Sequence, residues 1–327
     1  MLIKLVPENT EIPFTRQRFV AAALSVVLII GSIFAVVTAG LNFGVDFRGG
    51  VTVEVADDDP INLDAVRNAV GALNLGDFRV QEIQDVAGAE KGVVVFLEQQ
   101  LVDPEASEDV KKAAEQAQQT AAQSVQNALR SLLGEDIRFR RIDVVGPAVS
   151  GELIERGVLA VVLAIGMMLI YIWFRFEWQF SIGAILALVH DVIITLGVFA
   201  VTRLEFSLAI IAAILTIVGY SMNDTVVVYD RVRENLRKYK KRPLAEVLDL
   251  SINDTLSRTV MTSVTTLLAL IALYVIGGDV LRGFTFAMIW GVLIGTYSSI
   301  FVAAPLLLAT GVKRDWSTAA VAKSADA

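Results

Sequence analysis

The sequence contains no cysteine and a single histidine, His190. Without thiols there are no disulfides and no thiolate metal sites, and one imidazole is too few for a histidine-built metal centre. No glycine-rich loop precedes a helix in the pattern that binds phosphate groups, and no serine, histidine and aspartate set can be assembled outside the apolar segments. We therefore expect no metal, no cofactor and no conventional soluble enzyme.

Long apolar runs dominate what is present. Hydrophobic residues make up 55% of the chain and the mean hydropathy is +0.61, which is more apolar than a soluble domain. Uncharged runs of about 18 or more residues predict helices that cross a bilayer. Four such runs are Phe19–Ala39, Gly157–Phe174, Thr259–Gly278 and Gly283–Val312, and two more with ionisable residues inside are Trp178–Thr202 and Phe206–Tyr229. The sequence predicts an α-helical polytopic membrane protein with six transmembrane helices.

The first apolar run could be a signal peptide, because Thr38, Ala39 and Gly40 are small enough for a cleavage site. A signal peptide has an apolar core of about 7–15 residues, and this run of 21 residues is longer, so we expect it to be retained. The predicted segments in chain order are an N-terminus (1–18), the first span (19–40), an external domain (41–152), three spans (153–175, 179–202 and 206–229), a basic loop (230–256), two spans (257–278 and 283–311) and a tail (312–327).

The charges predict how the chain is oriented. Residues 230–256 hold seven lysines and arginines against five acidic residues, whereas residues 41–152 hold 10 against 20. Because cytoplasmic loops carry an excess of lysine and arginine, we expect 230–256 and both termini in the cytoplasm and 41–152 in the periplasm. This rule accounts for the basic loop without a nucleic-acid partner, and we expect none.

The external segment alternates strand and helix patterns. Strands are predicted over 51–56, 78–83, 93–97 and 137–145, and helices over 61–73 and 103–133. The resulting βαββαβ order predicts a ferredoxin-like α+β domain between the first and second spans. Helices on one face of its sheet would leave the other face or an edge free to bind an extended peptide. A spacer or docking domain is the alternative interpretation.

The fourth span contains a carboxylate, Asp224, directly after Asn223. At 100° per residue, Asp224 lies beside an arc of small and polar residues: Ala209, Ala212, Ala213, Thr216, Tyr220 and Asn223. The opposite side carries Ile211, Leu215, Val218 and Met222. Since small faces pack against other helices, we expect Asp224 and Asn223 to face protein or a water-filled cavity. A carboxylate inside a membrane indicates an ion or proton path by default.

Three other spans carry polar or small stripes. Asp191, with His190 about 100° away, is either a secondary relay or a satisfied structural pair. Arg258 shares a stripe with Thr262, Thr265, Ala269 and Ala272, and it is either a site residue or a side chain that reaches the membrane surface. In the last span the stripe of small residues Ala287, Gly291, Gly295, Ser299 and Ala303 predicts close helix packing.

Five stretches, taken in order, resemble the SecF family of protein-export membrane proteins, which belongs to the resistance-nodulation-division superfamily of proton-driven membrane machines. They are "NFGVDFRGG", "VGPAVSGELIERG", "LALVHDVIITLG", "IVGYSMNDTVVVYDRVREN" and "TLSRTVMTSVTTLLAL". The resemblance runs from Asn42 to the last helix. It implies one half of such a machine, with a SecD-like subunit of six further helices as the other half.

The resemblance also implies a function and its residues. Motif matches at "SMND" and "TLSRT" give Asp224 and Arg258, with Asn223 beside them, as a proton relay. The implied role is use of the proton-motive force to help preproteins finish crossing the SecYEG channel of the bacterial inner membrane, with SecA, YajC and YidC as further partners. Two alternatives stay open: a small-molecule efflux antiporter, which usually has twelve spans, and a non-transporting assembly protein whose buried charges set helix register.

Overall fold

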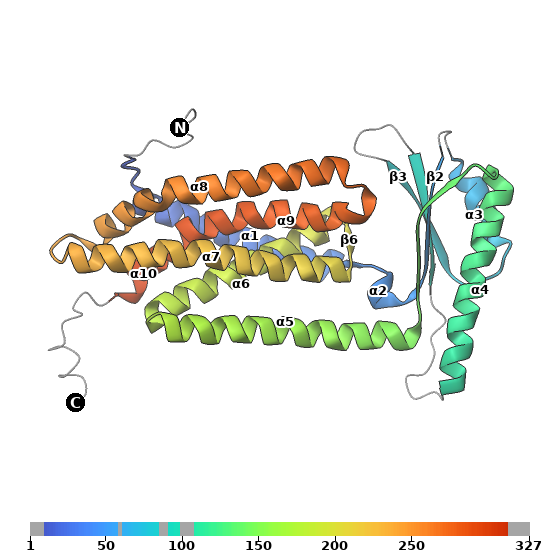
Figure 1. Cartoon of the computed structure of the whole chain (residues 1–327), viewed down its shortest axis with the longest axis horizontal. Helices are drawn as coiled ribbons and strands as arrows, with labels where there is room; N and C mark the ends of the chain where they lie inside the picture. The colour runs from blue at the N-terminus through green and yellow to red at the C-terminus, as the bar shows by residue number, and fades with distance from the viewer. Residues whose placement is uncertain (1–9, 58–60, 85–90, 99–107, 313–327) are drawn as a thin grey trace.

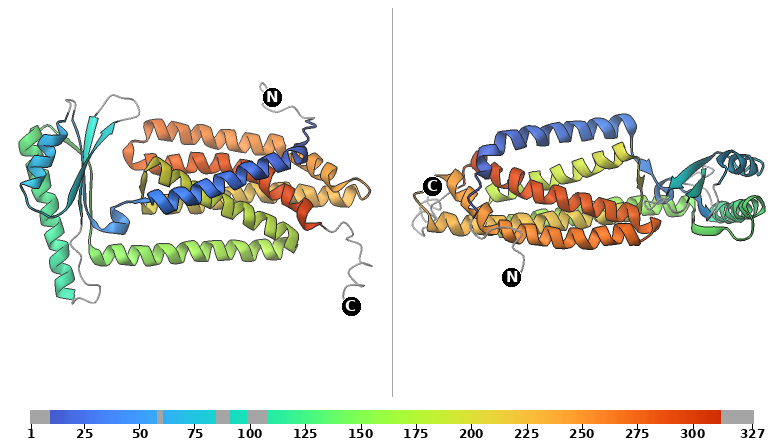
Figure 2. Two further views of the ribbon diagram at one scale, coloured as in Figure 1. Left: turned by 180° about the vertical axis from the view of Figure 1, so that it is seen from behind. Right: turned by 90° about the horizontal axis from the view of Figure 1, so that it is seen from above.

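The computed structural model describes residues 10–57, 61–84, 91–98 and 108–312. A bundle of long helices makes up one end of the molecule, and a sheet covered by two helices makes up the other (Figure 1, Figure 2). Six helices in the described ranges are long and apolar enough to cross a membrane. The six predicted spans are confirmed, and the chain is a multi-pass membrane protein.

The bundle helices follow the predicted spans but differ from them at their ends. They are α1 (Arg18–Ala39) after the 3-10 turn η1 (Phe14–Gln17), α5 (Pro147–Arg175), α6 (Trp178–Thr202), α7 (Leu208–Lys238), α8 (Leu244–Ile276), and α9 (Asp279–Ser298) continued by the π-helical turn η2 (Ser299–Ala303) and α10 (Ala304–Thr310). Helix α5 begins six residues before the predicted span, with Pro147 in its first turn. A proline is suited to that position because its missing N–H has no partner there in any case.

Where the sequence predicts a basic loop over 230–256, the structure has helix on both sides of a short turn. Helix α7 continues to Lys238 and α8 begins at Leu244. The charged extension is stabilised by Arg231, which pairs with Glu234 at 2.7 Å and with Asp254 of α8 at 2.8 Å. The extension also buries Val232, Asn235 and Leu236. Apolar runs alone mark only the membrane part of these helices, so they miss the extensions.

The external domain has the predicted βαββαβ order. Its elements are β2 (Gly50–Asp57), α3 (Leu63–Gly71), β3 (Phe78–Gln84), β4 (Lys91–Glu98), α4 (Glu108–Leu133) and β5 (Arg138–Val145). The strands lie in the order β3-β4-β2-β5 with antiparallel neighbours, as in a ferredoxin-like split βαβ sandwich. Asn62 begins α3 by accepting hydrogen bonds from the N–H groups of Asp64 and Ala65.

Alternating side chains divide the sheet into a covered and an uncovered face. Val51, Val53 and Val55 of β2 pack into one core with residues of both domain helices, including Val66 of α3 and Val125 of α4. Because successive strand residues point to opposite faces, the residues between these valines point away from the helices. That uncovered face is turned toward the membrane bundle (Figure 1).

The connections between the two parts contain elements that the sequence did not predict. A two-residue strand β1 (Asn42–Phe43) pairs in parallel with β6 (Glu205–Phe206), which lies between α6 and α7. One turn of helix, α2 (Val45–Arg48), follows β1 and leads into the sheet. Elements of two to four residues are too short to show a periodicity in the sequence. The pairing of β1 with β6 also depends on contact between segments that lie far apart in the chain.

Helices α7 and α9 approach closely along the small residues of α9. A Cβ atom on Gly291 would collide with Ile217 of α7, and one on Gly295 would lie 2.9 Å from the Cβ of Ser221. The bulky side chains of α7 therefore fit into spaces that only glycine leaves open.

We expect Gly291→Ala to destabilise the bundle by about 1–3 kcal/mol, because overpacking forces the neighbouring side chains or helices apart. Gly219→Ala is the matched control, since a Cβ atom there meets nothing within 4 Å, and alanine should favour the helix slightly. Thermal unfolding of the purified variants in one detergent measures both. Equal melting temperatures for the two variants would contradict close packing at Gly291.

Candidate functional site

The carboxylate of Asp191, on α6, is fully buried and receives hydrogen bonds from two other helices. Its Oδ2 accepts from Ser221 Oγ of α7 at 2.6 Å and from Ser298 Oγ of α9 at 2.7 Å. Its Oδ1 lies 2.9 Å from Nδ1 of the neighbouring His190. Asp191 thus joins three helices at one point, and both of its oxygens have partners.

His190 is also buried and joins this network, although the helical wheel placed it to the side. Its ring stacks on Tyr297 of α9 with centroids 6.0 Å apart. Tyr297 in turn donates from its hydroxyl to the carbonyl of Ala21 in α1 at 2.9 Å. Adjacent residues on a helix point about 100° apart, but the imidazole is long enough to bend back to its neighbour. Within the described residues, His190 Nε2 has no hydrogen-bond partner.

The carboxylate of Asp224, on α7, is buried but only half satisfied. Its Oδ1 accepts a hydrogen bond from Thr259 Oγ1 of α8 at 2.7 Å. Its Oδ2 is buried and makes no hydrogen bond within the described residues, although Ser299 of η2 lies nearby. Asp224 therefore has an oxygen available for a proton or for a cation that approaches, in contrast to Asp191.

Asn223 and Arg258 lie outside this buried contact. Both are exposed in the isolated chain, and neither makes an ion pair or hydrogen bond with Asp224 among the described residues. Asn223 directly precedes Asp224 on α7, and Arg258 directly precedes Thr259 on α8. The two residues therefore flank the Asp224–Thr259 hydrogen bond. The structure thus brings Asp224 and Arg258 near one another, on adjacent helices, without pairing them.

The small arc of α7, which is predicted to face protein or a water-filled cavity, is largely exposed in this chain. Four members of the arc are exposed, namely Ala209, Ala212, Thr216 and Asn223. Two residues of the opposite, bulky side are buried, namely Val218 and Met222. The small ridge of α9 packs instead on the face of α7 near Asp224, where Gly291 contacts Ile217 and Gly295 contacts Ser221.

The exposed surfaces of the bundle are of two kinds. The small polar stripe of α8 is exposed along its length, and so is most of the arc of α7. The stripe consists of Arg258, Thr262, Thr265, Ala269 and Ala272. Helices α1 and α5 instead expose large apolar side chains, such as Phe19, Phe34, Leu163, Met167 and Trp173. Bulky apolar surface suits lipid, and small polar surface suits another helix.

Further polar contacts join α7 to η2, directly after Asp224 and about one turn beyond it. Thr225 Oγ1 is 3.0 Å from Ser299 Oγ, and Tyr229 donates from its hydroxyl to the carbonyl of Ala303 at 3.0 Å. Ser299 and Ala303 are the ends of the π-helical turn η2. Pro305 follows and has no N–H for the helix, so the wider turn falls beside a local break in the hydrogen-bond ladder.

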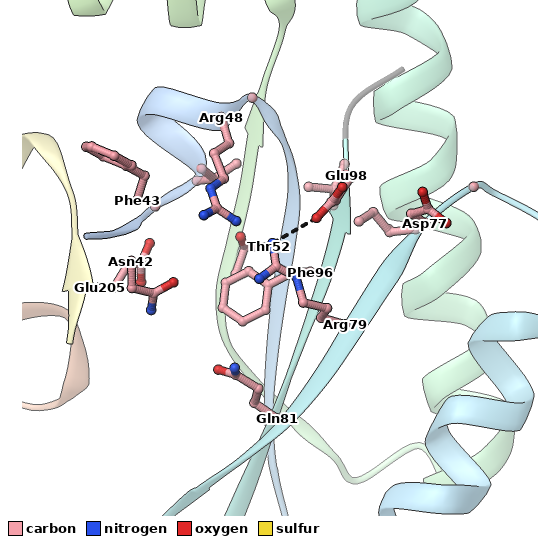
Figure 3. Close-up of a pocket in the computed structure, with 16 residues that line it drawn as sticks. Asn42, Phe43, Arg48, Thr52, Asp77, Arg79, Gln81, Phe96, Glu98 and Glu205 are labelled. Atoms are coloured by element: carbon pink, nitrogen blue, oxygen red, sulfur yellow. Dashed lines mark hydrogen bonds and ion pairs between the residues drawn. The ribbon is translucent and has the colours of Figure 1, made fainter. Parts of the chain in front are cut away.

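A cavity of about 690 Å³ lies between the uncovered face of the sheet and the connecting elements (Figure 3). The sheet contributes Thr52, Arg79, Gln81, Phe96 and Glu98, and the connections contribute Asn42, Phe43, Arg48 and Glu205. Arg79 and Glu98 form an ion pair of 2.8 Å on the sheet side. The cavity combines aromatic surface with charges of both signs. Sequence periodicity predicted the uncovered face but not the connecting elements that close the cavity.

Comparison with known proteins identifies the family. Residues 124–313 match the model of the protein export membrane protein SecD/SecF C-terminal region, which is more than half of the chain. The chain belongs to the SecD/SecF family. Residues 34–56, which include the Gly49-Gly50 pair at the start of β2, match the SecD/SecF GG motif.

The chain is similar over nearly its full length to curated members of this family. It is 45% identical over 315 residues to the protein translocase subunit SecF of Rhodobacter capsulatus, a match covering 96% of this chain and 93% of that one. It is 45% identical over 312 residues to the protein translocase subunit SecDF of Brucella abortus, covering 95% of this chain and 39% of that one.

A solved structure agrees with the fold. The crystal structure of SecDF from Thermus thermophilus, described as a translocon-associated membrane protein, superimposes with a TM-score of 0.76 at 33% sequence identity. The match covers 94% of this chain and 40% of the SecDF chain. The chain therefore spans less than half the length of these SecDF proteins.

Proposed function

We propose that the chain is a SecF-like subunit of the Sec preprotein translocase in the bacterial inner membrane. With a SecD-like partner, it couples the proton-motive force to late steps of protein export through the SecYEG channel. The observation that carries this proposal is the buried, half-satisfied carboxylate of Asp224 in a chain whose relatives are protein translocase subunits.

The proposed proton relay consists of Asp224, Arg258 and Asn223. With the guanidinium of Arg258 at a distance, the free Oδ2 of Asp224 is available to a proton. When Arg258 approaches, its positive charge favours the ionised carboxylate and the proton leaves. Asp224 lies on α7 and Arg258 on α8, so a relative movement of these two helices would alternate the two states.

The exposed polar stripes on α7 and α8 support a SecD-like subunit as the partner. A surface with Thr216, Asn223, Arg258 and Thr262 is costly against lipid, and another helix can satisfy it. In the Brucella relative the SecD and SecF parts lie in one chain. Placed against these stripes, the partner would stand next to Asp224.

Purification from native membranes tests the partnership. We expect a SecD-like subunit to co-purify with the chain in mild detergent, and Thr216→Leu together with Thr262→Leu to weaken that association. Leu163→Phe on α5 is the control, since that exposed side chain lies on the bulky apolar surface. Isolation of the chain without any such subunit would contradict the proposal.

The proposed membrane topology rests on the basic residues at the end of α7 and in the turn that leads to α8. We expect a reporter that is active only outside the cytoplasm to be active when inserted at Ala106 and inactive when inserted at Lys240. Ala106 lies outside the described residues, and Lys240 is exposed in the turn between α7 and α8. The opposite pattern of activity would contradict the predicted orientation.

The external domain is proposed to contact unfolded polypeptide at the cavity, rather than only along its strand edges. A photocrosslinking residue in place of Phe96 or Gln81, both lining the cavity, is expected to capture an arrested preprotein. The same residue in place of Gln123, exposed on α4, should capture much less. Equal capture from both faces, or capture of membrane partners alone, would favour the spacer interpretation.

A further inference from the structure

The start of α7 is fastened to the segment by which the chain enters the external domain. Strand β1 pairs with β6, and the N–H of Gly44 donates to the carbonyl of Phe206 at 2.9 Å. Asp46 of α2 accepts a hydrogen bond from the N–H of Leu208 at 2.9 Å. Leu208 is the first residue of α7, so a side chain from the entry segment caps this helix.

The segment by which the chain leaves the external domain is fastened to the same point. Arg141 of β5 pairs with Glu205 of β6 at 3.3 Å, and it also pairs with Asp143. Gly44 packs directly against the Glu205 side chain, where a Cβ atom would collide. Glu205 is thus held by the entry segment on one side and by β5 on the other. We call Asp46, Arg141, Glu205 and the β1–β6 pair the docking joint.

The docking joint carries more negative than positive charge, which does not favour its stability. Three carboxylates surround one guanidinium, and the side chains of Arg141 and Glu205 are only 25% and 27% exposed. Burial raises the pKa of Glu205 above its ordinary value, Arg141 lowers it, and the nearby Asp46 and Asp143 raise it again. A partly buried ion pair of this kind contributes little net stability, but it can fix the relative position of the parts that carry it.

We propose that the docking joint transmits movement of α7 to the external domain, with Arg141 and Glu205 as its positioning residues. Helix α7 runs unbroken from Leu208 to Lys238 and carries Asp224 sixteen residues after the joint. At 1.5 Å per residue, that separation is about 24 Å along one helix. A shift of α7 at Asp224 moves Leu208, and the joint conveys it to both chain segments that hold the sheet. Glu205 also lines the cavity, so the shift alters that site.

The inference rests on the proposed function, and its test separates the two. The subunit is assembled with its SecD-like partner in membrane vesicles, and preprotein translocation is measured with and without an imposed proton gradient. We expect Arg141→Gln and Glu205→Gln each to lower the gradient-dependent gain about fivefold or more, the lower range of coupling between sites. Translocation without a gradient should stay unchanged in Arg141→Gln, whose side chain does not line the cavity, and this shows that the variant still folds and assembles. The double variant should lose no more than either single variant, since the two residues act as a pair.

Arg67→Gln is the control, because it removes the exposed Arg67–Asp64 ion pair from α3 of the same domain without touching the joint or the cavity. Full gradient-dependent gain in Arg141→Gln and Glu205→Gln would overturn the inference, and so would losses that add in the double variant. Arg141→Lys, which keeps the charge, should recover part of the gain if position rather than folding is affected. If Asp224→Asn also keeps the full gain, the proposed function itself fails; if only the joint variants keep it, the joint alone fails.

Discussion

Replacing Asp224 by asparagine is expected to abolish the part of preprotein export that depends on the proton-motive force, while the complex still assembles. Asparagine keeps the size of the side chain and an acceptor for Thr259 Oγ1, so the contact between α7 and α8 remains. It cannot bind and release a proton. Pulse-labelling of an exported protein in cells should show slower export at unchanged levels of the subunit and its partner.

The expected loss is large because the driving force is large. One charge that crosses about 150 mV gains roughly 3.5 kcal/mol. That energy shifts an equilibrium between two states by roughly 300-fold, at 1.4 kcal/mol for each factor of ten. Arg258→Met should have the same effect, since methionine keeps an extended apolar side chain and removes the charge that expels the proton. Asp230→Asn is the matched control, because Asp230 lies on the same helix but is half-exposed and paired with Arg175.

Replacing Asp191 by alanine is expected to prevent stable assembly of the bundle. Ser221, Ser298 and His190 would lose their common partner in a fully buried place. Each unsatisfied buried group costs about 1–3 kcal/mol, so the sum is comparable with the whole stability of a domain. Thermal unfolding in detergent and the yield of purified protein measure this loss.

Asp191→Asn separates a structural role from a secondary relay. Both oxygens of Asp191 already have partners, whereas one oxygen of Asp224 has none among the described residues. We therefore expect Asp191→Asn to assemble and to keep most of the gradient-dependent export. His190→Ala should lower stability more than the helical wheel suggested, because the ring is buried between Asp191 and Tyr297. An assembled Asp191→Asn variant without gradient-dependent export would show instead that Asp191 carries protons.

The elements with strong periodicity could be predicted from the sequence. The six spans follow from uncharged runs, and the external sheet follows from alternation such as Val51, Val53 and Val55. The ends of helices were less accurate, since α7 and α8 continue past their apolar parts. Charged residues end an apolar run but not a helix, because ion pairs such as Arg231–Asp254 hold the extension together.

The candidate site could be predicted only in part. The buried position of Asp224 was predicted, because a carboxylate in an apolar run needs protein around it. Its partner Thr259 and the contacts of Asp191 with Ser221 and Ser298 depend on the rotation of three helices about their axes. A helical wheel gives the residues that share a face but not the neighbour of that face. The wheel therefore predicts that the small arc of α7 faces protein or a water-filled cavity, but not that most of the arc is exposed in this chain.

The docking joint left no signal in the sequence. Asp46 and Glu205 lie in a single helical turn and a two-residue strand, which are too short to predict, whereas Arg141 lies within the predicted strand β5. The three residues are spread over 160 positions, and nothing in the sequence links them. Only the folded chain brings them to the start of α7.

The most direct test of the account is preprotein translocation into inverted membrane vesicles that contain the Asp224→Asn subunit. Translocation is compared in the same vesicles with a proton gradient and after the gradient has been dissipated, next to the unchanged chain and Asp230→Asn. We predict that the gradient stimulates translocation in the unchanged chain and in Asp230→Asn, and that Asp224→Asn shows only the gradient-independent rate. Full stimulation in the Asp224→Asn vesicles would mean that this carboxylate is structural, and it would contradict proton coupling through α7.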